Sequence, residues 1–362
     1  MHSIRQLFSG RAWPLLASVG LAFGSARDAA AQSTIGASAT PNYVDVVRHD
    51  ADRRVDIIVG GQPFTSYIWP ASLMKPTLYP LRSASGVVVT RGYPLEPRAG
   101  ERVDHPHHVG LWFNYGNVNG LDFWNNSTAI KAADAPKMGT IVQRTVRDAK
   151  SGAGEGSLDV TTDWVNHEGK GILKEDTRFV FRATDGARII NRTTTLTALD
   201  RKVTFTDDKE GLIGMRVARA LEHPANAPEK FTDASGRPTT VAVLDNTGAT
   251  GHYLSSEGKA GDAVWGTRGR WTTLSGTVSG KPVTIAILDH PKNPGFPTYW
   301  HARGYGLFAA NPLGQKIFSN GKEELNLSLA PGQSQTFRYE VLILDGSPTR
   351  EQIEQFYARF TK

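Results

Sequence analysis

From Tyr43 onward the chain consists of short apolar segments that are broken at close intervals by turn residues. The segments are rich in Val, Ile, Thr, Phe and Tyr, and the residues between them are mainly Gly, Pro, Asn and Asp. In several segments, such as GSLDVTTDWVN and KPVTIAILDH, apolar and polar residues alternate with the period of a half-buried antiparallel strand. The number and spacing of these segments predict an all-β protein, a large antiparallel β-sandwich.

One segment near the C-terminus, SPTREQIEQFYARF, has the period of a helix instead. Ser347 or Thr349 can cap its first turn, and Pro348 suits a position near that turn. Its apolar residues fall on one face, namely Ile353, Phe356, Tyr357 and Phe360. We therefore expect a short C-terminal helix at 349–360 that packs on the sandwich, within one domain that spans 43–362.

The first 31 residues have the pattern of a signal peptide. Arg5 and Arg11 form a basic start, PLLASVGLAFGSA is a short apolar stretch, and small-residue cleavage sites precede Gln32. Residues 32–42, QSTIGASATPN, predict a polar linker. No later segment reaches the roughly 20 apolar residues that span a bilayer. We expect an exported protein, periplasmic or secreted, without a membrane span.

Cysteine content and charge narrow the chemistry further. The chain has no cysteine, which excludes disulfides, thiol catalysis and cysteine ligation of a metal. Its formal charge is +6, but the basic residues are scattered and form no run that resembles a nucleic-acid-binding arm. We therefore expect no nucleic-acid partner.

Residues 105–124, HPHHVGLWFNYGNVNGLDFW, crowd three histidines among aromatic residues and asparagines. If residues 105–113 are extended, His105 and His107 point to one face and His108 to the other. Single aromatic residues are more often core than ligand contacts, but grouped histidines suit proton transfer. The segment therefore predicts His107 and His108 as catalytic residues, and as substrate contacts His105, Trp112, Asn114, Asn119, Asp122 and Trp124.

Two further segments carry candidate site residues. In FTDDKEGLIGMRVARALEHP, 205–224, Glu210 is the candidate general base and Lys209 a substrate contact, although a solvated hairpin tip is the alternative. The proline-rich LDHPKNPGFPTYWHARGYGLFAANPLG, 288–314, predicts a stiff aromatic platform beside a catalytic His301. Its other predicted substrate contacts are His290, Tyr299, Trp300 and Arg303.

These three segments resemble the signatures of the DUF6807 family, often labelled "methane oxygenase PmoA". The resemblance extends over most of the chain after its leader, with one departure at Val109, where the family is expected to carry Arg. It implies a galactose-mutarotase-like supersandwich, a fold common among carbohydrate-active enzymes. It does not imply a copper oxygenase, because the methane monooxygenase subunit of that name is an integral membrane protein and this chain has no apolar span after its leader.

Three functions remain open at this point. The leading hypothesis is an exported carbohydrate-active enzyme, a hydrolase, lyase or epimerase that uses His/Glu acid–base chemistry on a sugar or glycoside. The first alternative is a noncatalytic glycan-binding protein. The second is a hydrolase that depends on a divalent metal held by His105, His107 and a third ligand from elsewhere in the chain. No other cofactor is expected.

Overall fold

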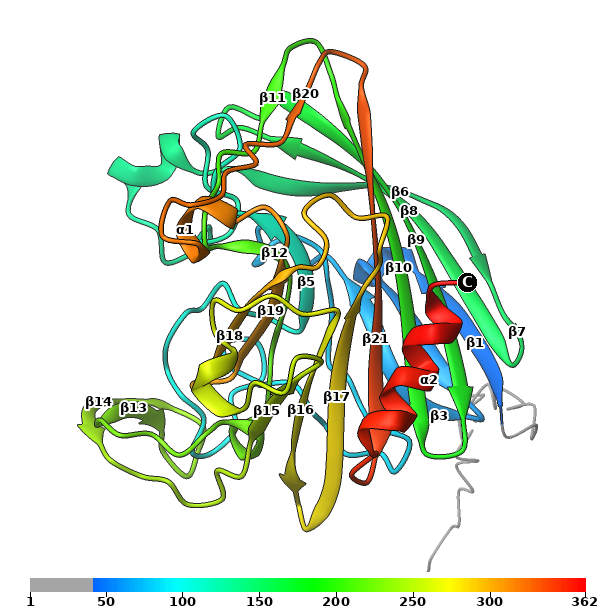
Figure 1. Cartoon of the computed structure of the whole chain (residues 1–362), viewed down its shortest axis with the longest axis vertical. Coiled ribbons are helices and arrows are strands. Elements are labelled where there is room, and N and C mark those ends of the chain that lie inside the picture. Colours follow the sequence, from blue (N-terminus) through cyan, green and yellow to red (C-terminus); the bar gives the residue numbers. More distant parts are fainter. Residues whose placement is uncertain (1–41) are drawn as a thin grey trace, which may run out of the picture. The chain divides into compact units, whose positions relative to one another are not determined.

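The computed structural model describes residues 42–362. The predicted signal peptide, and the predicted linker up to residue 41, lie outside the described residues, so the division into leader, linker and one domain stays a prediction. The described part is built mainly of antiparallel strands in two large sheets (Figure 1). The prediction of an all-β antiparallel sandwich is confirmed.

The first sheet has nine strands and the second has eight. In spatial order, the nine-stranded sheet contains β18 (Tyr299–Arg303), β19 (Leu307–Asn311), β12 (Gly211–Arg216), β5 (Leu111–Tyr115), β4 (Thr77–Leu78), β3 (Gln62–Ile68), β2 (Arg54–Val59), β1 (Tyr43–His49) and β7 (Gly152–Ala153). The eight-stranded sheet contains β15 (His252–Ser255), β16 (Trp271–Val278), β17 (Lys281–Asp289), β21 (Ser334–Asp345), β10 (Ala187–Ala198), β9 (Gly171–Thr184), β8 (Glu155–Val165) and β6 (Thr140–Lys150).

The remaining elements are short. Two small sheets pair β11 (Val203–Thr204) with β20 (Ser328–Leu329) and β13 (Glu229–Thr232) with β14 (Pro238–Val243). The helical elements are α1 (Gln315–Phe318), α2 (Arg350–Phe360) and the 3₁₀ turns η1 (Asp50–Asp52), η2 (Ala132–Lys137), η3 (Arg219–Leu221) and η4 (Gly261–Val264). Within residues 42–362 we find no helix with the length and apolar character needed to cross a bilayer.

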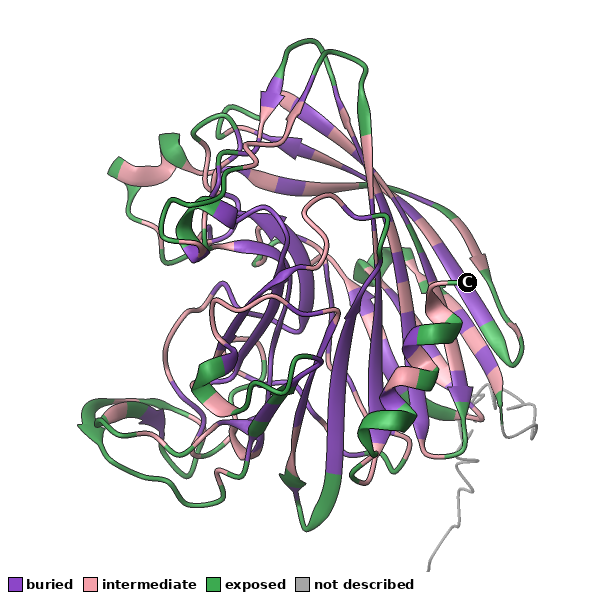
Figure 2. Cartoon of the chain, in the orientation of Figure 1, coloured by how far each residue is buried: buried purple, intermediate pink, exposed green. Residues whose placement is uncertain are grey.

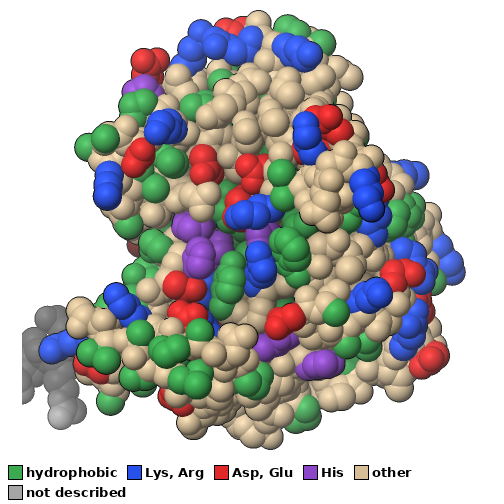
Figure 3. Space-filling model, turned by 60° about the vertical axis from the view of Figure 1, so that its left-hand side comes forward, with side chains coloured by type: hydrophobic (Ala, Val, Ile, Leu, Met, Phe, Trp, Pro, Cys, Tyr) green, Lys and Arg blue, Asp and Glu red, His purple; other side chains and the backbone are tan. Residues whose placement is uncertain are grey.

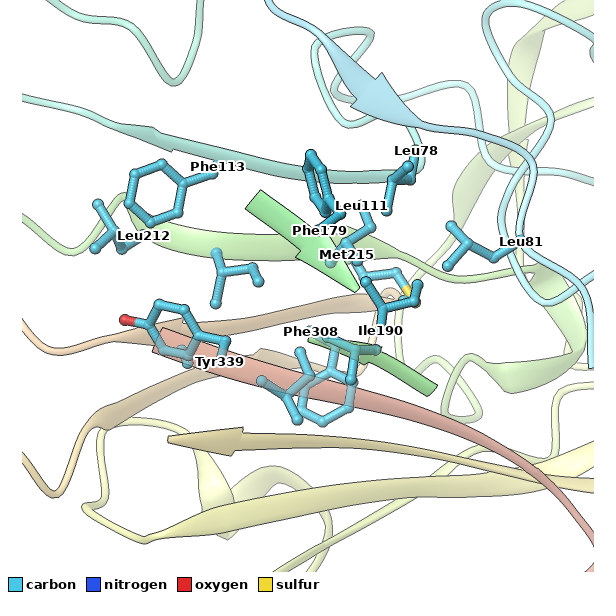
Figure 4. Packing of buried hydrophobic residues seen from close by; sticks show 14 of the residues in the cluster. Leu78, Leu81, Leu111, Phe113, Phe179, Ile190, Leu212, Met215, Phe308 and Tyr339 are labelled. Atoms are coloured by element: carbon cyan, nitrogen blue, oxygen red, sulfur yellow. The ribbon is translucent and has the colours of Figure 1, made fainter. Parts of the chain in front are cut away.

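The main core lies between the two large sheets. Leu111 and Met215 of the nine-stranded sheet belong to the same buried cluster as Phe179 and Ile190 of the eight-stranded sheet (Figure 4). Buried residues accordingly follow the strands of both sheets, whereas the β13–β14 hairpin is largely exposed (Figure 2). The alternation seen in the sequence thus buries one face of each sheet against the other.

The predicted C-terminal helix is present as α2, which packs on the outer face of the eight-stranded sheet (Figure 1). Thr349 accepts a hydrogen bond from the backbone N–H of Gln352, and the Gln352 side chain accepts one from the backbone N–H of Thr349. This capping box fixes the start of the helix. Ile353 and Tyr357 are buried against the sheet, as the apolar face predicted.

Candidate functional site

The candidate site lies on the outer face of the nine-stranded sheet, which points away from the main core. Along a strand, side chains alternate between faces, so His301, between the core residues Trp300 and Ala302, points outward. Strand register then places His301 opposite Ala309, Ala309 opposite Gly214, and Gly214 opposite Trp112. These four positions form one row across β18, β19, β12 and β5.

The two small residues in this row leave room for the ring of Trp124. A Cβ on Gly214 would lie 2.8 Å from Cζ2 of Trp112 and 3.0 Å from Cη2 of Trp124. The Trp124 ring lies 5.3 Å from that of Trp112 and 6.5 Å from that of His301, to which it is nearly parallel. Both tryptophans are fully buried, so they support the site from below and do not present their rings to a ligand.

Four parallel rings rise from Trp112 to the surface. Tyr305 stacks on His105 with 5.1 Å between centroids, His105 on His108 with 4.8 Å, and His108 on Trp112 with 5.0 Å. We call this stack the four-ring column. The expectation that 105–113 is extended is wrong, because β5 begins only at Leu111 and the N–H of His108 donates to the carbonyl of His105 across a turn. The turn brings His105 and His108 to the same side.

Two buried arginines hold this turn in place. Arg91 donates to the backbone carbonyls of Asp104 and His105, both at 2.9 Å, and of His108 at 3.2 Å. Arg216 donates to Oδ1 of Asp104 at 2.6 Å, and the Arg91 guanidinium also contacts this oxygen. Burial alone would raise the pKa of Asp104, but the charge of Arg216, the hydrogen bond from His105 and the charge of Arg91 together hold it well below its usual range. Asp104 is therefore a carboxylate at neutral pH.

Asp104 in turn orients His105. Its Oδ2 lies 2.8 Å from Nδ1 of His105. Because a carboxylate only accepts hydrogen bonds, Nδ1 of His105 carries a proton and Nε2 is left for another partner. The His105 side chain is 40% exposed, whereas His107 and His108 are 9% and 1% exposed as residues. Among the three histidines of this segment, His105 is the most exposed.

His107 and His108 are neutral in this environment. Burial lowers the pKa of His107 to about 2 and that of His108 well below its usual value, and the positive charges nearby act in the same direction. Nε2 of each ring is buried and has no hydrogen-bond partner among residues 42–362. The predicted role of these two side chains as a catalytic acid loses support, because neither holds the extra proton that an imidazolium donates.

A second histidine lies beside the predicted carboxylate. Nδ1 of His301 lies 2.7 Å from the backbone carbonyl of Lys209 and 3.8 Å from Oε2 of Glu210. Since a carbonyl accepts, Nδ1 carries the proton and Nε2 is unprotonated. Burial lowers the pKa of His301 to about 3, so the ring is neutral at pH 7. The structure therefore brings together His301, Glu210 and Lys209, whose ammonium pairs with the Glu210 carboxylate.

Local hydrogen bonds fix the turn that carries Glu210. Oδ1 of Asp208 accepts from the backbone N–H of Glu210 at 2.9 Å. The side-chain amide of Asn311 donates to the carbonyls of Asp208 and Lys209 at 2.8 and 2.9 Å. The Asp207 carboxylate accepts three backbone N–H groups, from residues 316, 325 and 326. The consecutive charges at 207–210 are thus not a free hairpin tip. Hydrogen bonds fix the carboxylates of Asp207 and Asp208, and the Glu210 carboxylate faces His301.

A cavity of about 590 Å³ opens beside the outer ring of the column, and we call it the Tyr305 cavity. The polar and aromatic residues of its wall include His223, Asn226, Asp262, Trp265, Arg303 and Tyr305. The guanidinium of Arg303 lies over the Trp265 ring at 4.3 Å from its centroid. On this face of the molecule, histidine side chains gather in a hollow with acidic and basic groups around it (Figure 3). The predicted contact Arg303 is therefore at the site.

Three predicted contacts from 288–314 lie away from this cavity. His290 packs against Phe360 of α2, with ring centroids 5.2 Å apart, next to the eight-stranded sheet. Trp300 points into the main core because it alternates with His301. Tyr299 stacks on Phe318 at 5.3 Å. Of this predicted platform, Arg303 lines the cavity, whereas His301 lies beside Glu210.

Three predicted contacts from 105–124 are structural. The Asn114 amide donates to the carbonyl of Phe123 at 2.6 Å and is fully buried. Asn119 has a φ of 52° and forms the predicted turn, and its Oδ1 accepts from the N–H of Thr204. Asp122 accepts from the backbone N–H groups of residues 124 and 125. These polar side chains complete turns and do not face the Tyr305 cavity.

The metal alternative lacks a ligand set in this structure. The rings of His105 and His107 are 5.6 Å apart, but the residues from 42 to 362 contain no group of three His, Asp or Glu side chains placed to hold a metal ion. Two imidazoles from one turn do not complete a tetrahedral site.

The fold and this face define a β-sandwich protein with a histidine-rich site on one sheet. The chain belongs to the family described as "Family of unknown function (DUF6807)", which it matches over residues 54–358. This confirms the resemblance seen in the sequence, and the description names no oxygenase activity. No curated protein matches the chain.

Solved structures with a similar fold include sugar-related proteins. A galactose 1-epimerase from Lactobacillus acidophilus is 12% identical, with 84% of this chain and 99% of that chain covered and a TM-score of 0.32. A galactose mutarotase-like protein from Clostridium acetobutylicum is 11% identical, with 82% and 94% covered and a TM-score of 0.31. A GH36 α-galactosidase from Geobacillus stearothermophilus in complex with stachyose is 12% identical, with 88% and 42% covered and a TM-score of 0.38. The chain thus spans 42% of the length of that galactosidase.

Proposed function

We propose that this protein is a carbohydrate-active enzyme that binds a sugar in the Tyr305 cavity and moves protons at the sugar. The observation that carries the proposal is the tautomer of two imidazoles. Nδ1 of His105 donates to Asp104, and Nδ1 of His301 donates to the Lys209 carbonyl. Nε2 of each ring is therefore left to contact a ligand, and in the neutral ring of His301 it can accept a proton or a hydroxyl hydrogen bond.

The cavity wall supports a sugar as the ligand. The aromatic rings of Tyr305 and Trp265 line the cavity, and aromatic rings suit the apolar C–H groups of a pyranose ring. Arg303, Asp262 and Asn226 offer charged and amide groups, which suit its hydroxyl edges. An apolar ligand would leave these polar groups without partners, and a nucleic acid would require more cations than this wall holds.

The two histidines are suited to different parts of the reaction. His105 is partly exposed and has a carboxylate behind it, so Asp104 stabilises the imidazolium that forms when Nε2 accepts a proton. His301 is buried and neutral, and we assign it the positioning of a hydroxyl beside Glu210, whose carboxylate is the general base. This arrangement favours imidazole–carboxylate chemistry over a two-carboxylate glycosidase, because the arginines and His105 already engage Asp104.

A noncatalytic glycan-binding protein is the competing function. It would use the same aromatic wall but would not need an arginine-anchored carboxylate to fix the tautomer of His105. We also keep export as part of the proposal, on the strength of the signal-peptide pattern at 1–31. Fractionation of cells that express the full chain tests this part, and protein found only in the cytoplasm would contradict it.

The function is tested by incubating purified protein with aldohexoses, methyl glycosides, disaccharides and uronic acids in D₂O. ¹H NMR then reports anomer exchange, bond cleavage or loss of a C–H signal, and saturation-transfer spectra report binding. We expect turnover of at least one sugar that falls by roughly 10²-fold in His105→Gln and in Glu210→Gln while binding persists. His290→Gln and Glu168→Gln are the matched controls, since the His290 ring packs on α2 and the Glu168 carboxylate accepts from the exposed side chain of Asn166. Binding without turnover in the wild type would leave the glycan-binding function, and neither binding nor turnover would overturn both.

A further inference from the structure

A second cavity, of about 160 Å³, lies at the other end of the four-ring column, and we call it the Lys75 cavity. Tyr305, the outer ring of the column, lines the Tyr305 cavity. Trp112, the inner ring, instead lies beneath the ammonium of Lys75, 5.5 Å from the ring centroid. The two cavities are therefore separate, and the sugar site described above does not use the second one.

Lys75 has a buried amino group without a carboxylate partner among residues 42–362. Its residue is 5% exposed, and Nζ donates to the backbone carbonyl of His107 at 2.8 Å. Among residues 42–362 the acidic group that acts on it is Asp122, which forms no ion pair with it. The Asp122 carboxylate already accepts hydrogen bonds from the backbone and side chain of Asn125 and from the backbone of Trp124. Burial lowers the pKa of Lys75 to about 7, because no carboxylate among residues 42–362 fully compensates the desolvation of its ammonium.

The other residues that line the Lys75 cavity indicate which kind of ligand fits it. The apolar part of the wall comes from Leu73, Met74, Pro94, Leu95, Pro106 and Val109. The polar groups beside Lys75 include the His107 ring, whose Nε2 is buried and unpartnered, and the hydroxyls of Ser127 and Thr128. A fitting molecule has a small apolar body and one anionic head that Lys75 and these hydrogen-bonding groups can contact.

We propose that the Lys75 cavity is a binding site for a small organic carboxylate, with the Lys75 ammonium as its counter-charge. A carboxylate supplies one negative charge in a planar group, which matches a single buried cation. A phosphate would bring about two negative charges at neutral pH and would leave one of them unpaired against an apolar wall. The cavity has room for several water molecules, and thus for a short-chain acid.

The experiment is a calorimetric titration of the full chain with sodium propanoate and butanoate. Neutral propanamide and inorganic phosphate are the comparison ligands. Lys75→Met keeps the volume of the side chain and removes its charge. Lys322→Met, at an exposed lysine, is the matched control. We expect carboxylate binding to the wild type and to Lys322→Met, at least about tenfold weaker binding to Lys75→Met, and weaker binding of both comparison ligands.

A second measurement needs no variant. In protein labelled with ¹³C at the lysine Cε, the Lys75 signal titrates with its ammonium, and bound carboxylate should move the titration midpoint to higher pH. An unmoved midpoint at saturating propanoate overturns the proposal. So does equal binding of propanoate and phosphate, or unchanged propanoate binding in a folded Lys75→Met. None of these results depends on whether the protein turns over a sugar.

Discussion

The imidazole of His105 lies parallel to the phenol ring of Tyr305, with 5.1 Å between the ring centroids and 5° between the planes. Tyr305 follows β18 and His105 precedes β5, so the stack joins two segments that are about two hundred residues apart in the chain. Tyr305 closes the four-ring column at the Tyr305 cavity, and Trp112 closes it at the buried end, beneath Lys75. The orientation of His105 therefore depends on packing as well as on Asp104.

Loss of this stacking partner should lower turnover. In Tyr305→Leu the His105 ring keeps its hydrogen bond to Asp104 but loses one parallel neighbour, a contact of about 1 kcal/mol. We expect turnover of the sugar found in the screen to fall roughly tenfold. Tyr305→Phe keeps the ring and is the control, and it should stay within a few-fold of the wild type. Equal losses in both variants would assign the effect to the hydroxyl instead of the stack.

Asp104→Asn should destabilise the fold. The substitution leaves the buried guanidinium groups of Arg91 and Arg216 without their shared counter-charge. Breaking one side of a buried ion pair costs about 3 kcal/mol, and urea-induced unfolding would measure the loss. Asp134→Asn removes an exposed pair with Lys137 and should change the free energy of unfolding by less than about 1 kcal/mol. Similar stabilities for the two variants would contradict the anchoring role of Asp104.

The buried histidines should make the fold sensitive to acid. Burial lowers the pKa of His301 to about 3, while an unfolded histidine titrates near 6.5. Between these values the unfolded chain binds a proton that the folded chain does not, so this contribution is complete above pH 6.5 and is lost as the pH falls toward 3. Urea unfolding of the wild type and of His301→Gln at a series of pH values measures the effect. The variant should show a shallower decline, by up to about 1.4 kcal/mol per pH unit, and identical slopes would refute the assignment.

Gly214→Ala should disturb the layer beneath the site. The new methyl group would lie within 3.0 Å of atoms in the rings of both Trp112 and Trp124, which are buried and cannot move freely. We expect a loss of about 2 kcal/mol in stability, together with a change in tryptophan fluorescence. Gly171→Ala is the control, because its methyl group would meet only the flexible end of Leu199. A Gly214→Ala protein as stable as this control would contradict the close packing of the row.

The fold could be predicted from local patterns. The alternating segments 156–166 and 281–290 form β8 and β17 in the structure. Of the two predicted caps, Thr349 is the residue that caps α2. These signals are local, since they arise from side-chain direction and from the first turn of a helix. The turn at Asn119 was predictable for the same reason, because Asn tolerates a positive φ.

The site could be predicted only in part. His301 and Glu210 were found by residue type, but their contact depends on a turn that Asn311 fixes from another strand. Arg91, Asp104 and Arg216 were missed, because scattered single charges give no signal until strand pairing brings them together. Asp104 lies directly before the histidine segment, and an acid next to a histidine is the one signal that could have indicated it.

We propose that a sugar in the Tyr305 cavity contacts the Nε2 atoms of His105 and His301. The most direct measurement is the ¹⁵N spectrum of histidine-labelled protein with and without the sugar identified in the screen. We expect the Nε2 signals of His105 and His301 to move on addition of the sugar, while both signals of His290 stay in place. Unchanged signals of His105 and His301 at saturating sugar, or a change confined to His290, would contradict it.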